Sequence, residues 1–158
     1  MTYLNPMMRL GLDKLDILAQ EIGLDGVLIS DLTPEESRRT GVNLKTDTVF
    51  LAAPTTNNER LMEICEASRG FLYLVARTGV TGSHTDVGKT VPAMMQKIRK
   101  NSAIPVAAGF GISNAADVAE VWKHADGAII GSAIIRFIEE NVDAADLAEC
   151  VGRFAMEK

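Results

Sequence analysis

The sequence predicts an α/β fold in which short parallel strands alternate with helices. Five apolar runs rich in β-branched residues are separated by segments with apolar residues at helical spacing. The runs are apolar throughout rather than alternating in polarity, which is typical of parallel strands covered on both faces. Repeated right-handed βα units form either an open doubly wound sheet or a closed barrel, and periodicity alone does not choose between the two.

Each element follows from a local pattern. Strands are predicted at residues 26–30, 48–52, 71–75, 104–108 and 127–130, and helices at residues 13–22, 59–68, 91–100, 114–123, 133–139 and 144–156. A short helix is expected from Thr33, because the polar segment from Arg38 to Asn43 ends it early. The tetrapeptides beginning at Thr33 and at Thr56 both fit a capping box. We expect one domain over residues 1–158, since no change of composition marks a boundary.

Composition restricts the functional classes. The net charge of −5 provides no basic field for nucleic acid. No apolar run reaches the length of a membrane span, and the N-terminus does not have the pattern of a secretion signal, so we expect a cytoplasmic protein without a membrane partner. Cys65 and Cys150 lie in helical segments without metal-ligand spacing, and we interpret both as structural thiols.

Three loops that contain glycine follow three of the predicted strands. They are residues 77–82, residues 109–113 and the pair Gly131-Ser132, which opens a helix. In parallel α/β folds and barrels, ligands bind at the carboxyl ends of the strands. Glycine allows backbone N–H groups to approach an anion, and a helix N-terminus adds a positive dipole end. The three glycine-containing loops at neighbouring strand ends, one of which opens a helix, together predict a site for a phosphate-bearing ligand.

Several motifs, taken in order, resemble the tryptophan synthase α chain. They are Asn5-Pro6, Asp31-Leu32-Thr33-Pro34-Glu35-Glu36, Ala53-Pro54-Thr55, the run from Tyr73 through Thr78-Gly79-Val80-Thr81-Gly82, Gly109-Phe110-Gly111-Ile112-Ser113, and Gly131-Ser132-Ala133-Ile134. The resemblance covers essentially the whole chain. It implies part of a TIM (β/α)₈ barrel of the ribulose-phosphate-binding type, to which this chain contributes the fourth to eighth βα units, with residues 1–4 as the fourth strand.

The resemblance also implies a reaction and its partners. The family cleaves indole-3-glycerol phosphate by a retro-aldol reaction to indole and glyceraldehyde 3-phosphate in tryptophan biosynthesis, without a cofactor in the α chain, and passes indole to a β subunit. By carry-over, the substrate phosphate is held by Gly82, Phe110, Gly111, Gly131 and Ser132. Tyr73 faces the indole-binding end of the pocket; Arg77, Thr81 and Gly82 belong to a lid over residues 77–88. Asn5 and Pro6 lie near the β-subunit surface.

No catalytic residue carries over from the family. Its catalytic Glu and Asp correspond to positions upstream of Met1, so we expect this chain to be inactive in isolation. Asp31 stands at a strand end, where it serves either a helix entry or lid contact or, alternatively, catalysis. Five strands also leave two open sheet edges, from which we expect self-association or pairing with another chain. The alternative to a lyase component is a non-catalytic module that binds phosphate or the β subunit.

Overall fold

The computed structural model describes residues 1–76, 87–109 and 111–157. Its strands are β1 (Gly26–Leu28), β2 (Asp47–Val49), β3 (Leu51–Ala52), β4 (Leu72–Val75), β5 (Val106–Gly109) and β6 (Gly127–Ile129). They pair only in parallel, in the orders β1-β2 and β3-β4-β5-β6. Sequential neighbours therefore lie side by side, which is the arrangement that the βα repeats predict.

The strand predicted at residues 48–52 is divided between two partners. Its first half, β2, pairs with β1, and its second half, β3, pairs with β4. Phe50 lies between the halves, and its carbonyl accepts a hydrogen bond from the N–H of Tyr73 at 3.1 Å. The β1-β2 ladder and the β3-β4 ladder are thus joined by the continuous segment that contains β2, Phe50 and β3.

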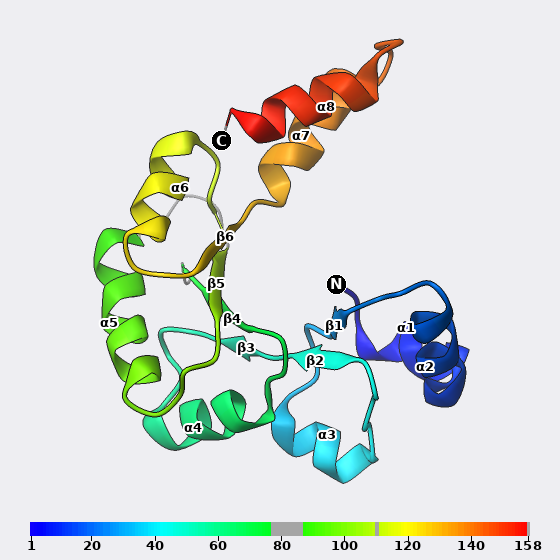
Figure 1. Ribbon diagram of the computed structural model, residues 1–158, viewed down its shortest axis with the longest axis vertical. Helices are drawn as coiled ribbons and strands as arrows, with labels where there is room; N and C mark the ends of the chain where they lie inside the picture. The colour runs from blue at the N-terminus through cyan, green and yellow to red at the C-terminus, as the bar shows by residue number, and fades with distance from the viewer. Residues whose placement is uncertain (77–86, 110, 158) are drawn as a thin grey trace.

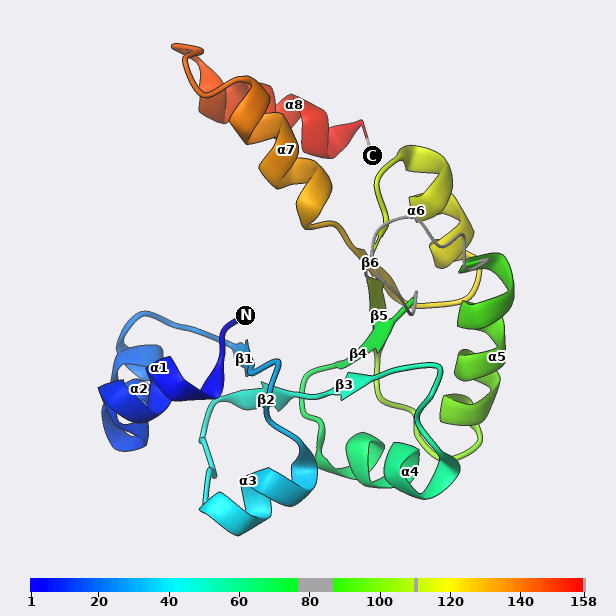
Figure 2. The same cartoon turned by 180° about the vertical axis from the view of Figure 1, so that it is seen from behind.

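The helices are α1 (Leu4–Leu10), α2 (Leu12–Glu21), α3 (Pro34–Thr40), α4 (Asn58–Ala67), α5 (Val87–Arg99), α6 (Ala115–Trp122), α7 (Ser132–Glu140) and α8 (Leu147–Met156). Figures 1 and 2 show a crescent in which α3 to α6 lie on the convex side of the strands. The α7–α8 pair projects beyond β6, and α1 and α2 lie beyond β1 at the opposite end. The two helices of the projecting pair pack on each other through the stacked rings of Phe137 and Phe154, whose centroids are 4.3 Å apart.

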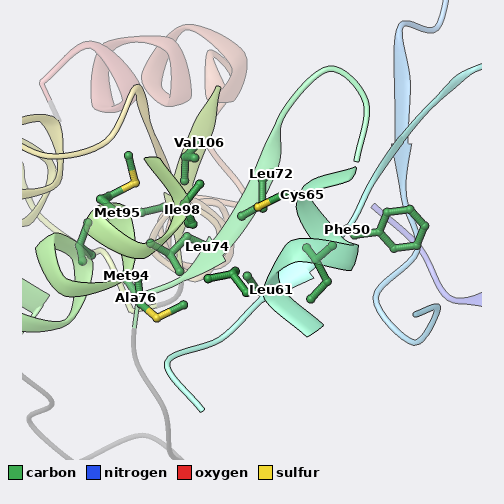
Figure 3. Close-up of a cluster of buried hydrophobic side chains, with 14 of the residues drawn as sticks. Phe50, Leu61, Cys65, Leu72, Leu74, Ala76, Met94, Met95, Ile98 and Val106 are labelled. Carbon is green, nitrogen blue, oxygen red and sulfur yellow. The ribbon is translucent and has the colours of Figure 1, made fainter. Parts of the chain in front are cut away.

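The pleat of the strands sorts their side chains onto two faces. Residues such as Leu72, Leu74 and Val106 point to the convex side, where they pack against helical side chains in the main core (Figure 3). Their neighbours in sequence point to the concave side, where Leu28, Val49 and Tyr73 form a smaller buried cluster. Successive residues of a strand alternate between faces, so one apolar run supplies both clusters.

The beginning of the chain differs from expectation. The strand expected at residues 1–4 is wrong: only Thr2 forms an isolated parallel bridge, in which its N–H donates to the Leu28 carbonyl and its carbonyl accepts from the Ser30 N–H, both at 2.9 Å. Helix α1, which the sequence pattern did not reveal, begins at Leu4. Its first N–H donates to Asp31 at 2.7 Å. The cap therefore comes from a residue 27 positions away, which no local motif could indicate.

Two of the predicted helix starts can be compared with the observed caps. The Thr33 hydroxyl accepts from the Glu36 N–H at 3.2 Å, as predicted. The second prediction was wrong by one residue, because Asn57, not Thr56, is the N-cap and accepts from the Arg60 N–H at 2.9 Å. The Thr56 hydroxyl instead accepts from the Ala53 N–H and closes the turn after β3.

Charged side chains fasten the amino ends of the strands. The buried Asp16 of α2 accepts from the Lys45 N–H at 3.0 and 3.1 Å, just before β2. Arg69 holds the same segment from the other side by donating to the Leu44 and Thr46 carbonyls. Farther along the sheet, Asp126 accepts from the Val106 N–H and from Arg99, and these two contacts lower the pKa of Asp126 below its ordinary value.

We predict that Asp16→Ala lowers the free energy of unfolding by about 1–3 kcal/mol, because the Lys45 N–H loses a charged acceptor at a buried site. Urea denaturation measures the change. Glu21→Gln, at an exposed position of the same helix, is the control and should change stability by less than about 0.5 kcal/mol. Equal losses of stability in the two variants would show that the hydrogen bond from the Lys45 N–H to Asp16 does not stabilise the fold.

Candidate functional site

The carboxyl ends of β4, β5 and β6 lie next to one another. Val75 is in register with Gly109, and Gly109 is in register with Ile129. The Ala76 N–H also donates to the Gly109 carbonyl at 2.6 Å. Because neighbouring strands are about 4.8 Å apart, the chain leaves the sheet at three adjacent points. The glycine-containing segments after β5 and β6 therefore begin side by side, next to the end of β4, whereas the loop predicted at residues 77–82 lies outside the described residues.

The loop after β5 turns sharply at Gly111 and then enters α6. Gly111 has a φ of +78°, in the left-handed region that favours glycine. The next residue, Ile112, is buried in the convex core and anchors the loop. Asp117 then accepts from both the N–H and the hydroxyl of Ser113, while its own N–H donates to Asn114 at 2.9 Å. This part of the loop is fixed by its own capping interactions, which leave Gly111 exposed.

The loop after β6 is a helix entry without a side-chain cap. Gly131 is the N-cap of α7 and has no side chain that could accept a hydrogen bond. Its carbonyl accepts from the N–H groups of Ile134 and Ile135. Gly131 and Ser132 are both exposed, and a Cβ added at Gly131 would meet open space. The start of α7 thus presents backbone N–H groups and a positive dipole end to the solvent.

Tyr73 lies on the concave face and reaches toward the same edge. Its side chain is 7% exposed, and burial raises the pKa of its hydroxyl above the ordinary value. The ring leans along the strand over Gly109, where an added Cβ would lie 2.3 Å from the Tyr73 hydroxyl oxygen and 3.0 Å from Cβ of Ile129. Gly109 is therefore a site residue in its own right. The sequence showed it only as a loop glycine, because its contact with Tyr73 depends on strand register.

A cavity of about 490 Å³ extends from Tyr73 along the concave face. Its walls include Leu28, Val49 and Ile129, and Asp25 and Asp47 lie at its amino-terminal end. The volume falls within the range of small-molecule sites. Most of the cavity, however, lies toward the amino ends of the strands. Tyr73 lines the cavity, and its hydroxyl reaches toward the carboxyl ends.

Among the residues that the structure describes, no group of three or more His, Cys, Asp or Glu side chains is arranged to hold a metal ion. Nor is any helix in the described part of the chain long and apolar enough to cross a membrane.

Comparison with known proteins decides the family. The family model described as tryptophan synthase alpha chain matches residues 1–156. This chain belongs to that family. The tryptophan synthase alpha chains of Solibacter usitatus and Methanosarcina mazei are 40% and 42% identical over 99% and 97% of this chain, which covers 60% and 57% of theirs.

Solved structures agree with this family assignment and with the fold. A chain of the Pyrococcus furiosus tryptophan synthase α2β2 complex matches with a TM-score of 0.80 and 31% identity over 98% of this chain and 63% of its own length. A structure from Aquifex aeolicus matches with a TM-score of 0.81 and 31% identity over 99% and 59%. The parallel βα arrangement is thus that of part of a tryptophan synthase α barrel. The chain spans about 60% of the length of the curated relatives that it matches.

The predicted site residues of this family member divide into two groups. Tyr73, Gly111, Gly131 and Ser132 are placed by the structure, the last three at adjacent strand ends and Tyr73 on the concave face. Arg77, Thr81, Gly82 and Phe110 lie outside the described residues. For Asp31, the hydrogen bond from the Leu4 N–H supports the helix-entry alternative.

We predict that Gly109→Ala lowers the free energy of unfolding by about 1–3 kcal/mol, because its methyl group overlaps the Tyr73 hydroxyl. In Gly109→Ala with Tyr73→Leu the overlap is gone, so the double variant should lose less stability than the sum of the single losses. Denaturant titration of all four proteins measures this coupling. Gly127→Ala on the next strand is the control, since its Cβ would lie an ordinary 3.5 Å from Ala107. Strict additivity would show that the two residues do not meet.

Proposed function

We propose that this chain provides the substrate-phosphate site of a tryptophan synthase α-type lyase, which cleaves indole-3-glycerol phosphate to indole and glyceraldehyde 3-phosphate. The observation that carries the proposal is the adjacency of the carboxyl ends of β4, β5 and β6, together with the open N-terminus of α7. Membership of the family supplies the substrate class.

Phosphate binding rests on backbone groups and one hydroxyl. An anion at the start of α7 would accept hydrogen bonds from the N–H groups of the first turn and from the Ser132 hydroxyl, and the helix dipole would stabilise its charge. Gly111, two residues beyond the register partner of Ile129, opens the neighbouring loop to the same space. We assign Gly82 and Phe110 to the same phosphate site, and Arg77, Thr81 and Gly82 to a lid over residues 77–88.

Tyr73 is proposed to contact the aromatic part of the substrate. Its ring lies among apolar side chains, and its hydroxyl is held at the edge of the cavity over Gly109. A flat aromatic ring packs favourably against such a wall. The indole would then lie toward the cavity and the glycerol phosphate toward the strand ends. A single elongated substrate can reach both places.

The acid and base groups of the reaction are proposed to come from outside residues 1–158. Retro-aldol cleavage requires proton transfer at indole C3 and at a glyceryl hydroxyl, which is typically worth 10²–10⁴-fold per group. Asp31, which follows β1, and Asp117, in the first turn of α6, both accept hydrogen bonds from backbone N–H groups at helix starts. This observation also favours the second candidate function, a non-catalytic module that binds phosphate.

A tryptophan synthase β subunit is the proposed protein partner. The Pyrococcus furiosus relative belongs to an α2β2 complex. In this chain, Asn5 and Pro6 are exposed on α1, which Asp31 ties to the carboxyl edge of the sheet. We further propose that residues 1–158 form a single partial-barrel domain and that the protein is located in the cytoplasm, in keeping with a biosynthetic role.

We predict that the isolated chain binds glycerol 3-phosphate but releases no indole from indole-3-glycerol phosphate, because it holds the anion without supplying the acid and base. Gly131→Asp should weaken binding at least tenfold, since the new carboxylate would repel the phosphate at the start of α7. Isothermal titration calorimetry measures binding, and indole absorbance measures turnover.

Gly152→Asp is the matched control for charge. It makes the same substitution in α8, where an added Cβ also meets open space, and should leave the affinity within twofold. Unchanged binding in Gly131→Asp would refute the phosphate site. Indole release by the isolated wild-type chain would refute the proposal that its residues do not supply the acid and base groups.

A further inference from the structure

A second cavity, of about 250 Å³, lies on the convex side of the molecule between α3 and α4. Figures 1 and 2 show these two helices as neighbours on that side. Two ion pairs join the helices, Arg38 with Glu63 at 3.4 Å and Arg60 with Glu35 at 3.6 Å. The cavity shares no lining residue with the larger cavity on the concave face. We call it the outer cleft, and the lining residues that matter here are Ser37, Arg38, Asn43, Thr48, Phe50 and Glu66.

The outer cleft exists because α3 ends early. This helix has seven residues and stops at Gly41, whose φ of +69° lies in the left-handed region. The chain then returns to β2 through residues 42–46 without a further turn of helix. The Ser37 hydroxyl donates to the Val42 carbonyl at 2.6 Å and so fixes the start of this return. The neighbouring α4 has ten residues, so the shorter α3 leaves a hollow beside it over β2.

Thr48 lies at the base of the outer cleft. It is in register with Val27, a residue of the convex core, so its side chain points to the same side of the sheet. Of the buried polar residues in the described part of the chain, Asp16, Thr46 and Ser68 all have side-chain hydrogen bonds. Thr48 is only 8% exposed, yet its hydroxyl forms no hydrogen bond with any described residue. Buried polar groups are rarely left without a partner, so this hydroxyl indicates a ligand in the cleft.

Charges of both signs line the outer cleft above this base. Arg38 comes from α3 and has a side chain that is 61% exposed, with one ion-pair contact at 3.4 Å to Glu63. Glu66 comes from the last turn of α4, is exposed, and has no ion-pair partner among the residues described. Asn43 is exposed beside them and carries an amide that can both donate and accept. The cleft thus offers a cation and an anion from its two helices over the buried ring of Phe50.

We propose that the outer cleft binds a small zwitterion of the α-amino acid class whose side chain carries a hydroxyl. The carboxylate of the ligand accepts from the Arg38 guanidinium and the Asn43 amide, and its ammonium group donates to Glu66. Its hydroxyl bonds to that of Thr48, and its small apolar part packs on Phe50. The volume of the cleft is just below the range of drug-sized sites, which restricts the ligand to a small molecule.

Ligands with one charge fit the outer cleft less well. An inorganic anion would pair with Arg38 but would also lie near the carboxylate of Glu66, and a simple amine would meet the reverse difficulty. Arg69 lines the cleft too, but its guanidinium already donates to the carbonyls of Leu44 and Thr46. A ligand that carries both charges satisfies both helices.

The test compares L-threonine with L-valine, which have nearly the same shape and differ in the hydroxyl. Two-dimensional NMR titration of the ¹⁵N-labelled full chain measures both affinities. L-threonine should bind at least fivefold more tightly and should shift the amide signals of residues 37–50. The acid 3-hydroxybutyrate, which lacks the ammonium group, should bind at least fivefold more weakly than L-threonine. Equal affinities for the two amino acids, or no saturable binding of L-threonine, would overturn the proposal.

Variants of the chain locate the ligand. Thr48→Val should reduce the affinity for L-threonine to that for L-valine, and an apolar side chain of the same shape suits this buried position. Arg38→Gln should weaken L-threonine binding at least fivefold. Arg39→Gln is its matched control and should stay within twofold, because the neighbouring Arg39 is 77% exposed and pairs with Glu36. A preference for L-threonine that survives in Thr48→Val, or equal effects of the two arginine variants, would also overturn the proposal.

The outer cleft and the phosphate site can fail separately. Gly131→Asp alters the start of α7 and should leave L-threonine binding unchanged, and loss of that binding would place the amino acid at the strand ends instead. Arg38→Gln should leave the affinity for glycerol 3-phosphate unchanged. A chain that binds L-threonine but not glycerol 3-phosphate would support the outer cleft and refute the phosphate site. The reverse result would refute the outer cleft alone.

Discussion

The packing of the convex strand residues against α4, α5 and α6 is the constraint on which the rest of the structure depends. Leu72, Leu74 and Val106 are fully buried there, and the strand pleat then fixes which residues face the other way. Tyr73 stands between Leu72 and Leu74, so the burial of its neighbours places its ring on the concave side. The geometry of the site is thus a consequence of core packing on the opposite face.

The same packing brings the carboxyl ends of three neighbouring strands together. With β4, β5 and β6 held in register from Val75 through Gly109 to Ile129, the segments that follow them leave the sheet at neighbouring points. The amino ends are fastened separately by Asp16, Arg69 and Asp126, at the edge away from these loops. The contacts that fasten the strands therefore lie at the edge opposite the one where ligands generally bind in parallel barrels.

Patterns of nearby residues predicted most of the elements. Apolar runs and helical spacing located the strands and all helices except α1, because both signals lie within a few residues of chain. The glycine loops were found for the same reason, since glycine and a helix start are local features. The family resemblance added the barrel, which periodicity could not distinguish from an open sheet.

What the sequence did not reveal depends on distant contacts. Helix α1 is capped by Asp31 from another βα unit, and the division of the strand predicted at residues 48–52 into β2 and β3 reflects two different partners. The contact between Tyr73 and Gly109 needs the register of two strands, so Gly109 could not be identified as a site residue from its own surroundings. Asn57 displaced Thr56 as a helix cap because the Thr56 hydroxyl closes the preceding turn.

The unequal covering of the sheet is tested most directly by thiol labelling at two consecutive residues of β4. In a Cys150→Ser background, Val75→Cys places a thiol on the concave face, and Leu74→Cys places one in the fully buried convex core. We predict that a soluble thiol reagent modifies the cysteine at position 75 at least a hundred times faster than the one at position 74 under native conditions. Equal rates at the two positions would contradict it.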